Sequence, residues 1–69
     1  MSAFLLMLLL GHMPTETWLD LNEDNRTATL TIVAKRYFAV NKDCAEAEII
    51  IEIKDGTTYF YGKCVKPTA

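Results

Sequence analysis

The sequence predicts an α+β fold: a four-stranded antiparallel meander with a short N-terminal apolar helix packed on one face. Three observations support this. Residues 49–61 place two runs of β-branched and aromatic residues around Asp55-Gly56, a strong hairpin signal. Residues 27–39 alternate apolar and polar side chains with the period of a strand. Residues 3–10 are an unbroken apolar run of helix-forming residues that ends at Gly11.

Residues 1–13 are assigned to an apolar helical or leader segment and residues 14–69 to an antiparallel β-sheet domain. The apolar run is far shorter than the roughly 20 residues a helix needs to span a bilayer, so no membrane span is expected. We favour a short helix lying across the apolar face of the sheet. Two alternatives stay open. One is a secretory leader, although Met1-Ser2 carries no basic side chain and no small-residue cleavage site follows. The other is an introduced tag ending at Gly11-His12-Met13.

Two strands are expected in the first half of the sheet domain. Residues 17–21 have the composition of a short strand, and residues 22–26 form a polar turn. Residues 27–39 carry apolar side chains at even positions and mostly Thr, Lys and Tyr at odd ones, which predicts a long, half-buried strand. Arg36 is the exception on its apolar face. Residues 41–43 supply the turn into the next strand.

The last two strands, residues 45–54 and 57–65, form the hairpin. A type I′ turn at Asp55-Gly56 places Ile51 opposite Phe60. Side chains alternate along each strand, so one face is apolar and the other is solvated. Further out, the expected cross-strand pairs are Ile49 with Gly62, Glu48 with Lys63, and Ala47 with Cys64. The apolar face collects Ala47, Ile49, Ile51, Ile53, Thr58, Phe60 and Cys64. The solvated face collects Glu46, Glu48, Ile50, Glu52, Lys54, Tyr59, Tyr61 and Lys63.

The two cysteines are expected to be reduced. Cys64 points into the core beside Ala47, whereas Cys44 has the opposite parity or lies in the preceding turn. A Cys44–Cys64 disulfide is therefore disfavoured unless Cys44 leaves the strand pattern. A zinc site is not expected, because these two residues and the lone His12 fall short of four closely spaced ligands. A thiol nucleophile would lack a base, since His12 lies in an apparent linker.

Composition and charge narrow the classes of function further. The formal net charge of the 69 residues is −2, and Lys35-Arg36 is a basic pair that alternation splits across the sheet, so we expect no nucleic-acid partner. There is no Gly-rich phosphate loop, and no cofactor is expected. Glu46, Glu48 and Glu52 lie in a row on the solvated face, where solvation of the sheet explains them. Asn25-Arg26-Thr27 fits a glycosylation sequon, which has meaning only if the chain is secreted.

The stretch from Ala28 to Val65 combines a Leu-x-Ile motif, a Tyr-Phe pair and the run Ala-Glu-Ile-x-Ile-Glu-Ile-x-x-Gly. With an apolar helix on long antiparallel strands, this pattern resembles the later strands of the hotdog fold of acyl-thioesterases and dehydratases. The resemblance implies an acyl-thioester site that a second chain completes. Hotdog domains are usually much longer, and they carry a catalytic Asp, Glu or His on or before the central helix, where this chain has only Leu and Met. No catalytic residue carries over.

Three functional interpretations follow. The favoured one is a small, non-enzymatic β-sheet module that self-associates or binds a protein partner through a sheet edge and an aromatic face. Its candidate binding surface consists of Trp18, Tyr37, Tyr59 and Tyr61, and a cytoplasmic location fits two reduced cysteines. The alternatives are a truncated hotdog-like acyl-thioester-binding domain and a small secreted domain with a Cys44–Cys64 bridge.

Overall fold

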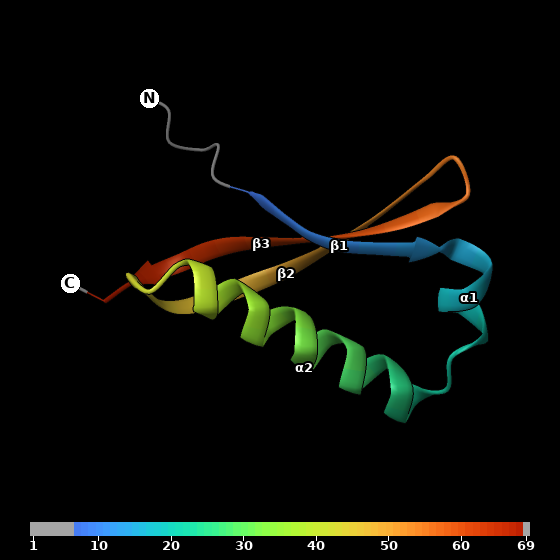
Figure 1. Cartoon of the computed structure of the whole chain (residues 1–69), viewed down its shortest axis with the longest axis horizontal. Coiled ribbons are helices and arrows are strands. Elements are labelled where there is room, and N and C mark those ends of the chain that lie inside the picture. Colours follow the sequence, from blue (N-terminus) through green and yellow to red (C-terminus); the bar gives the residue numbers. More distant parts are fainter. Residues whose placement is uncertain (1–6, 69) are drawn as a thin grey trace.

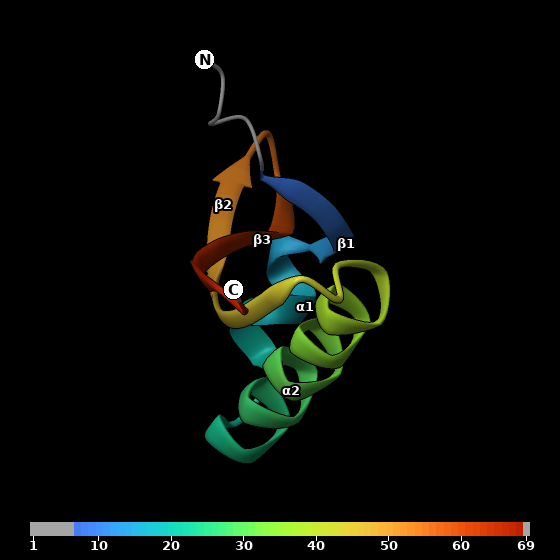
Figure 2. The same ribbon diagram turned by 90° about the vertical axis from the view of Figure 1, so that its left-hand side faces the viewer.

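The computed structural model describes residues 7–68, which form five elements along the chain. These are β1 (Leu8–Pro14), α1 (Thr15–Asp20), α2 (Glu23–Val40), β2 (Cys44–Lys54) and β3 (Thr57–Pro67). Within these residues the strands form one antiparallel sheet in the order β1-β3-β2, so β3 is central (Figure 1). Both helices lie against one face of this sheet, and the turned view shows the other face free of helices (Figure 2).

The β2–β3 hairpin confirms the predicted register. Asp55 and Gly56 have φ angles of 50° and 80°, as a two-residue type I′ turn requires. Ile51 lies opposite Phe60. The pairs of Ile49 with Gly62, Glu48 with Lys63 and Ala47 with Cys64 are also found. Local sequence sets this register. The pairing that the Asp-Gly turn requires also brings the apolar residues of both strands to the same face.

The strand predicted at residues 27–39 is wrong, because this segment lies in α2. Asn22 caps the helix: its Oδ1 accepts a hydrogen bond from the Asn25 amide at 2.8 Å. Two threonines fit a helix because each hydroxyl donates to the carbonyl four residues earlier, Thr29 to Asn25 and Thr31 to Thr27. The buried side of α2 follows helical spacing, with its members at Leu30, Val33, Ala34 and Tyr37. The predicted four-stranded meander is therefore corrected to three strands and two helices.

The N-terminal assignments are also corrected. Residues 8–14 form β1 rather than a helix, and the expected helical positions before residue 7 lie outside the described residues. Pairing with the central strand outweighs the helix propensity of the leucines. The helices α1 and α2 cover the apolar face of the sheet instead. The short strand expected at 17–21 is instead mostly α1. The expected boundary after residue 13 falls inside β1, which pairs with β3.

The core lies between β3 and the two helices. Its buried hydrophobic members are Leu10, Trp18, Val33, Tyr37, Cys44 and Phe60. The ring of Trp18 packs edge-on against Phe60, with ring centroids 5.2 Å apart. Buried Thr58 meets Thr15 at the start of α1 through a 3.0 Å hydroxyl–hydroxyl hydrogen bond. The short helix α1 is therefore held to β3 by two specific contacts.

Gly62 marks the closest approach of α2 to β3. A β-carbon at this position would overlap the ring of Tyr37 and lie 2.9 Å from Cδ1 of Leu10. Tyr37 is fully buried, and its hydroxyl accepts a hydrogen bond from Asn41 Nδ2 at 2.8 Å, so the ring has little freedom to move. Glycine at position 62 thus allows the helix to lie directly on the central strand.

We predict that Gly62→Ala lowers the free energy of unfolding by about 1–3 kcal/mol, the usual cost of overpacking. Gly11→Ala is the matched control, because its β-carbon would have a single neighbour within 4 Å, Nη1 of Arg36 at 3.4 Å, which is not an overlap. Urea denaturation of both variants is the measurement. Equal midpoints for the two would contradict the close approach of Tyr37 to β3.

Candidate functional site

The outer edge of β2 is the first candidate binding feature. β2 pairs with β3 on one side, and no other described strand pairs with its second side. In a two-residue hairpin the residues flanking the turn exchange backbone hydrogen bonds, and this pattern repeats at every second residue. Lys54 and the other even-numbered residues therefore bond to β3. The odd-numbered residues Ile49, Ile51 and Ile53 direct their amides and carbonyls outward.

The side chains along this edge are apolar and incompletely covered. Ile49 is half-buried against the core. Ile51 is 39% exposed and Ile53 is 54% exposed, although both lie on the face of the sheet that carries the helices. An exposed strand with free amides and apolar side chains is a template for pairing with another chain.

The second candidate is the face of the sheet opposite the helices, which we call the open face. Tyr59 and Tyr61 occupy its centre on β3, with ring centroids 6.4 Å apart. On β1, the His12 ring lies 6.1 Å from that of Tyr59, and exposed Leu9 pairs with Tyr61. On the other side, Ile50 of β2 also pairs with Tyr61. The open face therefore presents a cluster of half-exposed aromatic and apolar groups.

Only two of the four predicted surface aromatics lie on this face. Trp18 is 7% exposed and Tyr37 is 1% exposed, so both belong to the core between the helices and the sheet. Their predicted surface placement followed from reading residues 17–21 and 27–39 as strands and is corrected. Two members of the open face, Leu9 and His12, could not be found because β1 was not expected. Ile50 was already placed on the solvated face by its parity.

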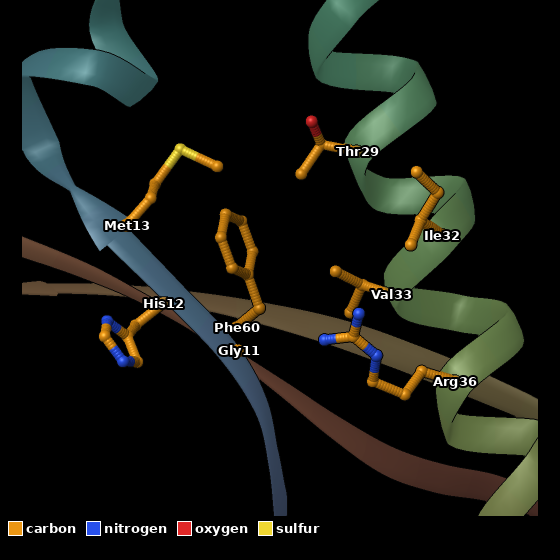
Figure 3. A pocket seen from close by; sticks show the side chains of 8 residues that line it. All are labelled: Gly11, His12, Met13, Thr29, Ile32, Val33, Arg36 and Phe60. Carbon is orange, nitrogen blue, oxygen red and sulfur yellow. The ribbon is translucent and has the colours of Figure 1, made fainter.

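A pocket of about 160 Å³ lies between β1 and α2 (Figure 3). Met13, Val33 and Phe60 form part of its apolar wall, and Arg36 extends from α2 toward β1 (Figure 3). Nη1 of Arg36 donates a 2.7 Å hydrogen bond to the carbonyl of Leu10. The β1–β3 register shifts between Leu9 and Gly11, so Arg36 satisfies backbone at a β-bulge. Sequence alternation placed Arg36 as the one charged residue on an apolar face. Its hydrogen bond to Leu10 gives the side chain a structural role in that position.

The structure joins Cys44 and Cys64 in a disulfide, with Cα atoms 5.8 Å apart, which corrects the expectation of two free thiols. The expectation failed because β2 is irregular at its start. The register shifts between Cys44 and Glu46 and again between Glu46 and Ala47. These shifts take Cys44 out of the strand alternation, so its side chain is buried and reaches Cys64.

Residues 7–68 contain no group of three or more His, Cys, Asp and Glu side chains that could hold a metal ion. Glu46, Glu48 and Glu52 are exposed along β2, as their parity predicted. His12 lies in β1, and its ring is on the side of the strand away from α2 (Figure 3). Neither helix in this part of the chain is long and apolar enough to cross a membrane.

Comparison of the chain with protein-family models, curated proteins and solved structures finds no match. The hotdog resemblance thus has no support from relatives. Part of the pattern that suggested it, from Leu30 to Phe38, lies in α2 rather than in a strand.

We predict that replacing both cysteines by alanine lowers the free energy of unfolding by about 3 kcal/mol, the loop-closure term for cysteines 20 positions apart. Reductant should destabilise the unmodified protein by a similar amount and leave the double variant unaffected, as followed by denaturant titration. Labelling of both cysteines by a thiol reagent in the air-oxidised native protein would contradict the disulfide.

Proposed function

We propose that this protein is a small, non-enzymatic β-sheet module that self-associates or binds a protein partner through the outer edge of β2. The observation that carries the proposal is the eleven-residue β2, whose free edge exposes Ile51 and Ile53. A further strand added there would satisfy the outward amides and cover apolar surface in one step.

Two features that block edge pairing in other proteins, a bulge and a lysine on the edge strand, lie at the two ends of β2. The bulges at its start fall between Cys44 and Ala47, and the positively charged Lys54 is its last residue. Between them, residues 47–53 pair regularly with β3 and contain no proline or glycine. The middle of the edge is therefore free to accept a strand.

The open face adjoins this edge and supplies the second part of the proposed binding surface. Tyr59 and Tyr61 present apolar ring surface with a polar hydroxyl, a combination enriched at protein interfaces. Ile50 connects these rings to β2, since it pairs with Tyr61. A partner strand at the edge would carry its own side chains onto this face, next to Ile50. The edge would provide affinity through the backbone, and the open face would provide selectivity.

The second candidate function, a small secreted domain, is favoured by the Cys44–Cys64 disulfide. Disulfides persist in oxidising compartments and are rare in the cytosol, so we propose an oxidising compartment in place of the cytoplasmic location that free thiols suggested. Asn25 of the glycosylation sequon is exposed in the first turn of α2. Mass spectrometry of the protein from its native host tests this proposal. An intact bridge supports it, whereas two free thiols in the freshly isolated protein would refute it.

We predict that Ile51→Lys abolishes association, because it puts a charge at the middle of the edge. Ile32→Lys is the matched control, since Ile32 is also an exposed isoleucine but lies on α2. Sedimentation equilibrium over a range of micromolar concentrations should show association for the unmodified protein and the control, and a monomer for Ile51→Lys. The proposal would be overturned if the unmodified protein stays monomeric and binds no partner strand at this edge. It would also be overturned if the unmodified protein and both variants associate equally.

A further inference from the structure

We propose that the partner of the β2 edge is a second copy of this chain, paired antiparallel about a two-fold axis that lies between Ile51 and its equivalent. This inference rests on the proposed function and specifies its partner and register. It follows from the parity of β2, from the positions of its charges and from the direction of its backbone groups.

Parity restricts the registers that two copies of β2 can adopt. Residues opposite each other in an antiparallel pair project from the same face of the sheet. A residue of one copy can therefore face only a residue of equal parity in the other. One residue must then face its own equivalent across the two-fold axis. In the middle of the strand the candidates for this residue are Ile49, Ile50, Ile51 and Glu52.

The charges of β2 distinguish these four registers. An axis at Ile49 places Glu46 opposite Glu52 of the second copy. An axis at Ile50 places Glu48 opposite Glu52, and an axis at Glu52 places Glu52 opposite itself. Like charges directly opposite each other are destabilising. These three registers each contain at least one such pair.

The axis at Ile51 removes every glutamate–glutamate opposition. Glu48 then faces Lys54 of the second copy, and symmetry forms this opposite-charge pair twice. Glu48 already pairs with Lys63 of its own chain, so in the dimer it lies between two lysines. On the helix side, Ile49 faces Ile53 of the second copy and Ile51 faces its own equivalent. This register thus matches opposite charges at Glu48 and Lys54 and apolar side chains on the helix side, although Ile50 faces Glu52 of the second copy on the open face.

Backbone directions fit the same register. The outward amides and carbonyls belong to the odd-numbered residues, so Ile51 and its equivalent would exchange hydrogen bonds across the axis. Glu48 and Lys54 would form non-hydrogen-bonded pairs, in which the side chains approach more closely. The two sheets would join into one, with β2 of each copy at its centre and β1 at each outer edge. The exposed isoleucines of both copies would then meet in one continuous apolar strip.

A charge reversal tests the register. Glu48→Lys and Lys54→Glu should each raise the dimer dissociation constant about tenfold or more, because each replaces two opposite-charge pairs by two like-charge pairs. The double variant Glu48→Lys/Lys54→Glu restores opposite charges and the original net charge, so its dissociation constant should return to within about threefold of the unmodified value. Glu46→Lys and Lys42→Glu are controls that change net charge equally. In this register Glu46 lies beyond the paired residues 48–54, and Lys42 lies outside β2, so both controls should dimerise normally.

The outcomes separate this inference from the proposed function. Rescue by the double variant, together with an isotope-filtered nuclear Overhauser contact between Glu48 and Lys54 of different copies, would support the register. If Ile51→Lys abolishes association but the charge variants have no effect, the register is wrong and the edge function stands. If the unmodified protein is monomeric but binds another chain at β2, self-pairing is wrong. If β2 binds nothing, both proposals fail.

Discussion

The type I′ turn at Asp55-Gly56 is the constraint on which the rest of the structure depends. Its two positive φ angles close the hairpin with two residues and fix which residue of β2 faces which residue of β3. That register decides which side chains enter the core and which form the open face. It also decides which amides of β2 bond to β3 and which point outward. The core and the proposed edge site thus follow from one local feature.

The position of α2 explains why part of the apolar face remains exposed. Tyr37 of the helix lies against Gly62 of β3, and Val33 is buried in the same core cluster. Ile49, opposite Gly62, is half-buried by this packing. Ile51 and Ile53 lie nearer the hairpin turn, where the covering is incomplete. A single helix is about 10 Å across with its side chains, so it covers a sheet of three strands only in part.

The sequence predicted the register of the hairpin from its turn to the pair of Ala47 and Cys64, but not the irregular start of β2 or the elements that surround the hairpin. Alternation was ambiguous in residues 27–39, since Leu30, Val33, Ala34 and Tyr37 also match helical spacing. The decisive signals were the Asn22 cap followed by Glu23 and Asp24, and eighteen residues without Gly or Pro, which is long for a strand. β1 could not be predicted from local signals, because its leucines favour a helix and only pairing with β3 makes it a strand.

The side chains of the candidate binding surface were placed on the correct face only where the strand that carries them was predicted correctly. Tyr59 and Tyr61 follow from the hairpin and were placed on the correct face, whereas Trp18 and Tyr37 depended on strands that do not exist. Ile51 and Ile53 were also placed on the correct face, but they were expected in the core and are 39% and 54% exposed. The disulfide was missed for a different reason. It depends on two register shifts at the start of β2, and β-bulges in that position have no sequence signal comparable to the Asp-Gly turn.

Amide hydrogen exchange along β2, measured by nuclear magnetic resonance at several protein concentrations, tests the central claim most directly. The amides of Glu48, Ile50 and Glu52 bond to β3 and should stay protected at every concentration. Those of Ile49, Ile51 and Ile53 point outward, so they should be protected at high concentration and lose protection on dilution. If the odd-numbered amides exchange at the same rate at every concentration, the outer edge of β2 does not pair with a second copy.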